Sequence, residues 1–164
     1  KFEKAYFQRF KNIWHHGDYA EVKKSDGYII YGRSDTTLNP GGVRLGTAEI
    51  YSEVEKFKQV KESLAVGQSW DNDIRIILFI ILNKGYDLNN DLVKKIKKQI
   101  RINASPRHVP EKIISVTDIP RTKNGKIVEL AVKNTIEGNK IKNKEALANP
   151  EILKEYVNIK ELND

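Results

Sequence analysis

Nine consecutive residues, Ile74 to Leu82, have the sequence IRIILFIIL, in which Arg75 is the single polar side chain. A strand with one face in water would alternate apolar and polar residues, whereas this run is apolar at almost every position. Its length, its isoleucine content and the turn residues on both sides favour a strand over a helix. We therefore predict a central strand that is covered on both faces.

The flanking sequence predicts the other elements of a small domain. Two shorter strands are expected over 63–66 and 112–116, with a polar connection over 67–73. Four helices are predicted from N-cap residues and from apolar residues spaced by three or four positions. They begin near Thr47 and after Asn89 or Asn90, extend over 127–136, and begin again at Asn149-Pro150-Glu151. The tail 139–149 is polar and is expected to be loose.

The first 35 residues are predicted to form strands and turns. Segments 19–22 and 28–31 are apolar or alternating, and Lys24-Ser25-Asp26-Gly27 between them is typical of a hairpin turn. The predicted fold class is α+β, with a roughly three-stranded central sheet flanked by helices and preceded by this hairpin-rich segment.

Composition limits the classes of protein that the chain can represent. Its 164 residues suit one domain, or one domain with an appendage, and 39% hydrophobic residues can bury a core. No apolar run approaches the roughly 18 residues that span a bilayer, and the first residues do not have a signal-peptide pattern. With no cysteine, the chain has no disulfide, thiolate nucleophile or Cys-ligated metal, which fits a cytoplasmic location.

Positive charge is concentrated in residues 94–126, which hold ten basic and two acidic residues and so carry +8, against +7 for the whole chain. Such a segment attracts polyanions: a nucleic acid, an anionic membrane surface or a phosphate-rich small molecule. A lysine-rich helix face that is only solvated gives the same pattern.

Several catalytic motifs are absent from the sequence. It contains no phosphate-binding P-loop, no G-x-G-x-x-G, no H-E-x-x-H and no Gly-x-Ser-x-Gly elbow. His15 and His16 are adjacent and on a strand would point to opposite faces, so we expect no metal site.

Four segments, in this order and spacing, resemble motifs of the adenylate-forming acyl-CoA synthetase superfamily. They are Trp14-His15-His16-Gly17-Asp18; Gly32-Arg33-Ser34-Asp35 followed by GVRLGTAEI over 42–50; SPRHVP over 105–110; and PRTKNGKI over 120–127. The resemblance covers about residues 6–137. Finer details, such as VELAVK over 128–133 and Asn149-Pro150-Glu151, are similar to the acetoacetyl-CoA synthetase subfamily.

This resemblance implies a division of the chain into three parts. Residues 1–35 would be the end of a large N-terminal adenylation domain together with the hinge, and 36–140 a mobile C-terminal domain. Residues 141–164 would be a C-terminal extension with a helix. The phosphate loop and acyl pocket would lie in the large domain, which is the expected partner, and a fragment without them would be inactive.

The family reaction has two steps: a carboxylate attacks the α-phosphorus of ATP, and CoA then displaces AMP. The resemblance implies that Lys126 is the catalytic lysine of the first step, where positive charge stabilises the reacting phosphate. Asp18 would accept hydrogen bonds from both ribose hydroxyls, and Arg33 would help to hold the ribose or phosphate.

The second step implies further roles. Asp35 matches the hinge about which the C-terminal domain rotates, and Gly42 would leave room for pantetheine. Arg44 would face phosphate groups in one orientation, and Arg107 is our candidate for the CoA phosphates. Trp70 stands where the resemblance leads us to expect a polar residue.

The resemblance thus implies an acid–thiol ligase that converts acetoacetate, ATP and CoA into acetoacetyl-CoA, AMP and pyrophosphate. ATP and CoA would be substrates, and Mg²⁺ is expected with ATP, bound by ligands outside this chain. Two alternatives stay open: another short-chain acyl-CoA synthetase, such as one for acetate, and a basic nucleic-acid-binding module supported only by the charged segment.

Overall fold

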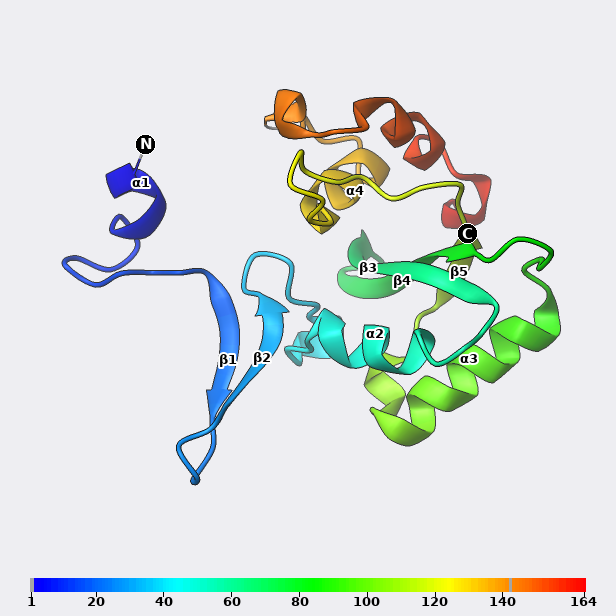
Figure 1. Ribbon diagram of the computed structural model, residues 1–164, viewed down its shortest axis with the longest axis horizontal. Coiled ribbons are helices and arrows are strands. Elements are labelled where there is room, and N and C mark those ends of the chain that lie inside the picture. The colour runs from blue at the N-terminus through cyan, green and yellow to red at the C-terminus, as the bar shows by residue number, and fades with distance from the viewer. Residues whose placement is uncertain (1, 142) are drawn as a thin grey trace.

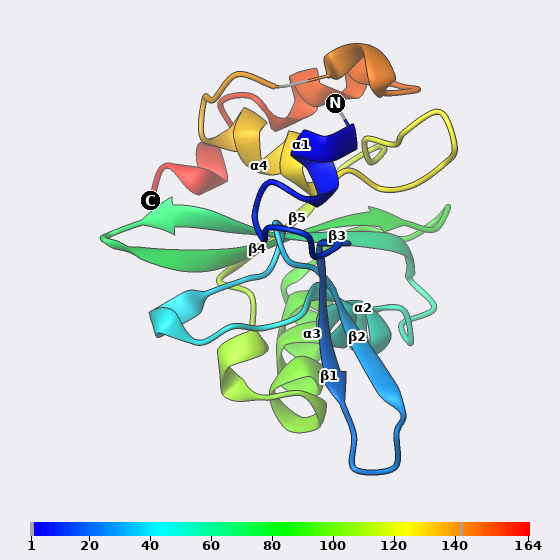
Figure 2. The same cartoon turned by 90° about the vertical axis from the view of Figure 1, so that its left-hand side faces the viewer.

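The computed structural model describes residues 2–141 and 143–164. Most of their helices and strands are stacked in layers (Figure 1). A central sheet separates α2 (Thr47–Val54) and α3 (Asn90–Asn103) on one side from α4 (Glu129–Ile136) and the C-terminal 3₁₀ turns on the other. A separate two-stranded hairpin projects beside these layers (Figure 2). None of the described helices combines the length and apolar character needed to cross a bilayer.

The sheet consists of β3 (Val60–Trp70), β4 (Asp73–Leu82) and β5 (Lys112–Ser115), with β4 in the middle. β3 and β4 are antiparallel, whereas β4 and β5 are parallel. The predicted α+β class, the three-stranded sheet and the central position of the apolar strand are therefore confirmed.

Both faces of β4 are buried, and its side chains alternate between two cores. Leu78 and Ile80 belong to the cluster beneath α2 and α3, whereas Ile77 and Phe79 belong to the cluster beneath α4 and the C-terminal segment. All four side chains have 0% exposure. This alternation is the period-two geometry of a strand and explains why the run tolerates almost no polar residue.

The predicted polar connection over 67–73 is wrong, because β3 and β4 continue to a tight turn. Trp70 pairs with Asp73, which leaves only Asp71 and Asn72 between the strands. Both have positive φ, 46° and 59°, as a two-residue hairpin turn requires. The polar side chains of this segment are thus compatible with a long strand whose end reaches solvent.

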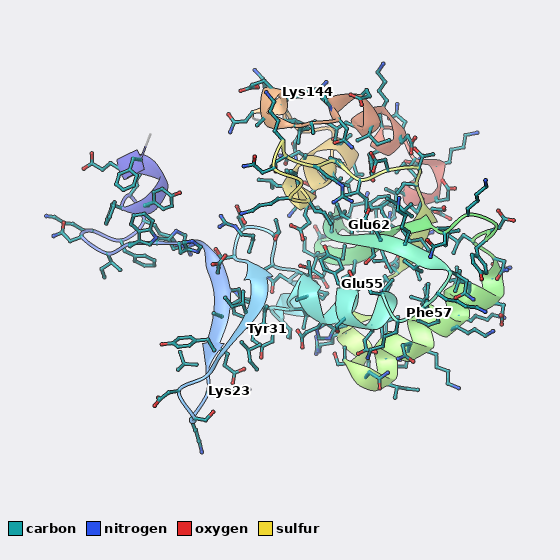
Figure 3. The ribbon with its side chains drawn as sticks, viewed as in Figure 1. Lys23, Tyr31, Glu55, Phe57, Glu62 and Lys144 are labelled. Atoms are coloured by element: carbon teal, nitrogen blue, oxygen red, sulfur yellow. The ribbon has the colours of Figure 1, made fainter. Side chains whose placement is uncertain are left out.

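The helix boundaries follow from local contacts. The Asn89 side chain accepts a hydrogen bond from the Leu92 amide (2.9 Å), which confirms one of the two predicted caps of α3. Thr47 does not cap α2; Gly46 precedes the helix instead. A Cβ at Gly46 would lie 2.5 Å from the carbonyl oxygen of Tyr31, so only glycine fits beside this residue of the hairpin (Figure 3).

The hairpin itself agrees with the prediction, but the residues before it do not. β1 (Asp18–Val22) and β2 (Tyr28–Arg33) pair antiparallel. The first residues form a short helix, α1 (Phe2–Tyr6), where strands and turns were predicted. Trp14 stacks on Tyr6 with ring centroids 4.3 Å apart, and this contact joins the helix to the segment before β1.

The C-terminal region is more ordered than its composition suggests. The predicted last helix is a 3₁₀ helix, Pro150–Tyr156, and α4 begins at Glu129 rather than at residue 127. The tail 139–149 was predicted to be loose, but its later part pairs with an earlier loop: the Ala148 amide donates to the Arg121 carbonyl (2.8 Å). Residue 142 of this tail lies outside the described residues.

Arg75, the polar residue of the central strand, attaches the end of the chain to the sheet. It is 5% exposed, and its guanidinium donates to the Leu162 and Asp164 carbonyl oxygens (both 2.6 Å). The indole of Trp70 lies over the guanidinium, with the ring centroid 3.7 Å from Cζ. Gln68 and Glu111 accept its remaining hydrogen bonds (2.9 and 3.1 Å). Each nitrogen of this buried guanidinium thus donates at least one hydrogen bond.

Replacing Arg75 by alanine should therefore destabilise the domain. We expect Arg75→Ala to lower the free energy of unfolding by about 3 kcal/mol. The substitution leaves the Leu162 and Asp164 carbonyl oxygens without their donor and removes the stacking partner of Trp70. Urea unfolding measures the change. Lys98→Ala, an exposed control on α3, should alter it by less than about 0.5 kcal/mol. Equal stabilities of the two variants would contradict this role.

Candidate functional site

A cleft of about 520 Å³ lies between the hairpin and the loop that follows β5. It brings together one lysine from that loop and residues more than ninety positions earlier: Tyr6, Arg9, His15, His16, Gly17, Arg33, Ser34, Asp35 and Lys126. The sequence motifs that contain Asp35 and Lys126 therefore meet at one place in the fold.

The end of the hairpin arranges two carboxylates around one guanidinium. Asp18 is the first residue of β1 and pairs with Arg33, the last residue of β2. Nη1 of Arg33 lies 3.7 Å from Asp18 Oδ1, and Nε of Arg33 donates to Asp35 Oδ1 (3.4 Å). The other Asp18 oxygen is hydrogen-bonded to His16 Nδ1 (2.5 Å). Arg33 thus contacts two other predicted site residues, Asp18 and Asp35.

Gly17 makes room for this arrangement. Its φ is +92°, and a Cβ there would lie 2.8 Å from Arg33 Nη2. Its carbonyl oxygen accepts a hydrogen bond from the Ser34 amide (2.8 Å), which holds the two ends of the hairpin together. A residue with a side chain would both strain the backbone and displace the guanidinium.

Lys126 extends from a short hairpin-like loop. The Thr122 amide donates to the Lys126 carbonyl, and the Gly125 amide donates to the Thr122 carbonyl (both 2.8 Å). Gly125 has a φ of +78°, which permits the turn. Lys126 is exposed, and its ammonium group takes part in none of the ion pairs formed by residues 2–141 and 143–164.

The outer side of the Lys126 loop is held by Asn149. Its Oδ1 accepts from the Arg121 amide (2.9 Å), and its Nδ2 donates to Asp118 Oδ2 (2.7 Å) and the Ile119 carbonyl (3.0 Å). Asn149 occupies the predicted N-cap position, but the helix that follows is 3₁₀ and the Asn149 side chain makes no capping hydrogen bond, because it bonds to the loop.

A second cleft, of about 580 Å³, lies at the turn between β3 and β4 and contains Gly42 and Trp70 in its lining. The Gly41 amide donates to both oxygens of Asp73 (2.9 Å each), and Arg107 Nη1 is 3.0 Å from the Cβ position at Gly41. The Ile74 and Gly41 amides and the charge of Arg107 hold the pKa of Asp73 below its usual value. Gly42 therefore lines a cleft separate from that of Lys126, and Arg107 lies beside Gly41, next to this cleft but outside its lining.

Arg44 belongs to neither cleft. It is exposed and lines neither the cleft of Lys126 nor that of Gly42. The structure thus gathers Asp18, Arg33, Asp35 and Lys126 at one site. It places Gly42 in another cleft with Arg107 beside the neighbouring Gly41, and leaves Arg44 on the surface.

Much of the basic segment is bonded within the fold. Three of its ten basic side chains pair with carboxylates, namely Lys95 with Asp91, Lys112 with Asp164 and Arg121 with Glu62. Lys97 donates to the Glu111 carbonyl (2.7 Å), and burial lowers its pKa. The charge available to an external polyanion is correspondingly smaller than the composition suggests.

The sequence did not predict the contacts of three residues in or near the site: His16, Asn149 and Glu129. His16 stands two residues before Asp18, so a turn there was the available signal. Glu129 contacts Thr47 and Tyr51, which are 82 and 78 positions away, and no local pattern could reveal such contacts. In the described part of the chain, no group of three or more His, Cys, Asp or Glu side chains could hold a metal ion.

Comparison with known proteins gives a consistent assignment. Residues 49–126 match the model of the AMP-binding enzyme C-terminal domain. The chain is 57% identical over 162 residues to acetoacetyl-coenzyme A synthetase of Rhizobium meliloti (strain 1021), and 47% identical over 164 residues to acetoacetyl-CoA synthetase of Gallus gallus. Each alignment covers 99% of this chain and 25% of the relative.

A solved structure has the same fold. The acetoacetyl-CoA synthetase from Streptomyces lividans superposes with a TM-score of 0.88 at 34% identity, over 99% of this chain and 25% of that chain. The chain therefore spans about a quarter of the length of the relatives that it matches.

The contacts of Asn149 predict a local effect on the Lys126 loop. In Asn149→Ala the Arg121 amide loses its acceptor, so we expect its hydrogen exchange to accelerate roughly tenfold, as the loss of one such hydrogen bond implies. Exchange measured by NMR tests this. Asn163→Ala, an exposed control in the same C-terminal segment, should leave the Arg121 rate unchanged. An unaltered exchange rate of the Arg121 amide in Asn149→Ala would show that Asn149 does not hold the Lys126 loop.

Proposed function

We propose that this chain, whose residues 49–126 match the AMP-binding enzyme C-terminal domain, is the C-terminal part of an acetoacetyl-CoA synthetase. The whole enzyme would convert acetoacetate, ATP and CoA into acetoacetyl-CoA, AMP and pyrophosphate. The acyl pocket and the phosphate loop would lie in the N-terminal adenylation domain, outside this chain, and the chain alone would be inactive.

The observation that carries the proposal is the cleft in which Lys126 faces Arg33 and Asp35, next to Asp18. In the first half-reaction the acetoacetate carboxylate attacks the α-phosphorus of ATP and pyrophosphate leaves. Negative charge at the reacting phosphate and carboxylate would be stabilised by the Lys126 ammonium. Asp18 has two acceptor oxygens for the vicinal ribose hydroxyls, and Arg33 would keep it oriented.

A rotation about Asp35 is proposed to separate the two half-reactions. Asp35 lies in the turn between β2 and the segment leading to α2, where a change of backbone dihedrals would swing the remainder of the domain. In this division, 1–35 ends the adenylation domain, 36–140 is the mobile domain and 141–164 is an extension. Lys126 has to leave before CoA can attack, since both need the same carbonyl.

The second cleft is proposed to serve CoA. Gly42 has no heavy atom within 4 Å of its Cβ position, so pantetheine could approach the backbone there. Arg107 would bind CoA phosphates, and Arg44, exposed here, would meet nucleotide phosphates in the other orientation. Mg²⁺ is proposed to accompany ATP, with ligands outside this chain, and a cytoplasmic location is also proposed.

The two alternatives have less support. A synthetase for another short-chain acid, such as acetate, does not match the names of the relatives reported above. A nucleic-acid-binding module rested on the basic segment, whose side chains are partly paired in the fold. Base-selective binding with a steep salt dependence would favour that module.

Removal of the Lys126 ammonium should separate the half-reactions. In the full-length enzyme we expect Lys126→Ala to lower pyrophosphate exchange by a factor of at least about 10², because one electrostatic contact to the transition state is lost. Formation of acetoacetyl-CoA from supplied acyl-adenylate should change little.

The matched control is Lys123→Ala, which removes an exposed ammonium group from the same loop. It should retain both half-reactions. Equal loss of both half-reactions in Lys126→Ala, or unchanged pyrophosphate exchange, would refute the proposed role of Lys126.

The hinge proposal predicts a different pattern for Asp35→Pro. Proline fixes φ near −65°, so the domain would be trapped in one orientation and one half-reaction would fall by about 10² while the other persisted. Asp35→Ala leaves the backbone free and should retain both. Two unimpaired half-reactions in the proline variant would rule out a hinge at this position.

A further inference from the structure

Glu129 is a partly buried carboxylate at the start of α4, three residues after Lys126. It forms no ion pair with any lysine or arginine among residues 2–141 and 143–164. Burial raises its pKa, and the hydroxyl groups of Tyr51 and Thr47 act in the opposite direction. A carboxylate held by neutral donors alone is costly to bury, so its hydrogen bonds determine whether it stays in place.

These hydrogen bonds join three elements. The Tyr51 hydroxyl donates to Glu129 Oε1 (2.9 Å), and the Thr47 hydroxyl lies 3.4 Å from the same oxygen. Tyr51 in turn accepts from the Ala65 amide of β3 (3.1 Å). The first turn of α4 is therefore fixed to α2 and to the edge of the sheet at one point.

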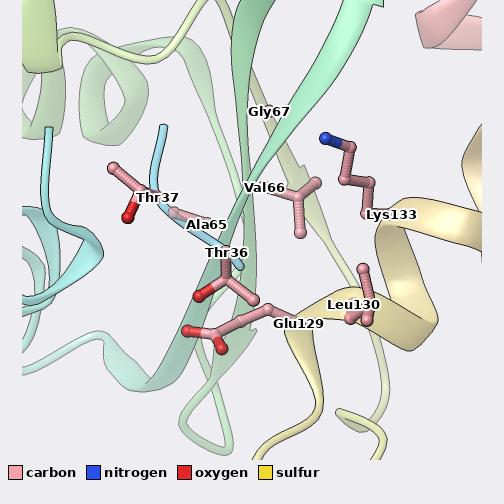
Figure 4. Close-up of a pocket in the computed structure, with 8 residues that line it drawn as sticks. All are labelled: Thr36, Thr37, Ala65, Val66, Gly67, Glu129, Leu130 and Lys133. Carbon is pink, nitrogen blue, oxygen red and sulfur yellow. The ribbon is translucent and has the colours of Figure 1, made fainter. Parts of the chain in front are cut away.

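The same carboxylate faces the segment that follows Asp35. A cavity of about 10 Å³, large enough for roughly one water, separates Thr36 and Thr37 from Glu129 and from β3 (Figure 4). In Figure 4 the carboxylate of Glu129 points toward Thr36, whereas the ammonium of Lys133 extends away from it. Glu129, at the start of α4, thus lies next to the segment that follows the proposed hinge.

The start of α4 also fixes one end of that loop. The Val128 amide donates to the Pro120 carbonyl (3.0 Å), which closes the loop immediately before Glu129. A shift of Glu129 therefore moves the exit of the loop relative to Asp35. Displacement of a reacting group by about 1 Å can cost as much as 10²-fold in rate.

We propose that Glu129 is a positioning residue for the first half-reaction: through Tyr51 it fixes the Lys126 loop relative to α2 and the hinge segment. The inference rests on the proposed function and assigns a role in the first half-reaction to a residue that would contact neither ATP nor acetoacetate. It differs from a general stabilising role, because only the step that uses Lys126 depends on where the loop lies.

The test uses the full-length enzyme with Glu129→Ala and Tyr51→Phe, the second of which removes a single oxygen atom. We expect each variant to lower kcat of pyrophosphate exchange roughly tenfold while KM for ATP changes less than about twofold. Thioester formation from supplied acyl-adenylate should stay within about twofold. Glu129→Gln keeps an acceptor oxygen for Tyr51 and should restore most of the exchange rate.

Two controls match the substitutions. Tyr86→Phe removes a hydroxyl from a tyrosine that is 39% exposed, and Glu145→Ala removes an exposed carboxylate. Both should leave both half-reactions unchanged. Thermal unfolding of each variant identifies any that do not fold. If Glu129→Ala does not fold, the half-reactions of Tyr51→Phe decide the outcome.

The inference is overturned if Glu129→Ala and Tyr51→Phe reduce both half-reactions equally, or if neither reduces pyrophosphate exchange. It is also overturned if Glu129→Gln is as impaired as Glu129→Ala. Lys126→Ala separates this failure from failure of the proposed function. If Lys126→Ala impairs exchange while the Glu129 and Tyr51 variants do not, only the positioning role is lost.

Discussion

The burial of β4 on both faces is the constraint on which the rest of the structure depends. Leu78 and Ile80 need cover from α2 and α3, and Ile77 and Phe79 need cover from α4 and the C-terminal segment. Each layer therefore has a fixed side of the sheet. The two layers meet at the edge strand β3, where the Ala65 amide donates to the hydroxyl of Tyr51 and the same hydroxyl donates to Glu129. A polar contact thus joins helices from opposite faces around the edge of the sheet.

The candidate site is assembled from short contacts between segments that are distant in sequence. One side is the end of the hairpin, where the Arg33 guanidinium lies between Asp18 and Asp35. The other is the Lys126 loop, closed by its own backbone hydrogen bonds and held on its outer side by Asn149. Lys126 itself remains exposed and outside the ion pairs of the described residues. This combination of a fixed loop and a free ammonium suits a group that acts on a substrate phosphate.

Local patterns predicted those elements whose stability is local or whose burial is extreme. The apolar run predicted the central strand, and the hairpin turn predicted β1 and β2. The sequence narrowed the cap of α3 to Asn89 or Asn90, because a cap bonds an amide only three residues away. The errors concern residues whose partners are remote. Asn149 has the predicted N-cap position, but its side chain binds the Arg121 amide and does not cap the next helix. Segment 67–73 is strand apart from its two-residue turn, Asp71-Asn72, which lets polar residues reach the strand ends. The last residues of the tail before Asn149 pair with a loop more than twenty residues earlier.

By itself, the sequence determined the fold class, the central strand and the motifs that contain Asp18, Asp35 and Lys126, because periodicity and motif spacing are properties of the chain order. Only the tertiary structure decided that Lys126 shares a cleft with Arg33 and Asp35, that Gly42 lines a different cleft, and that Arg44 lies in neither. It also decided the environment of Glu129. The physical reason is that these relations depend on how layers stack on a sheet, and contacts across 70 or more residues leave no periodic signal in the sequence.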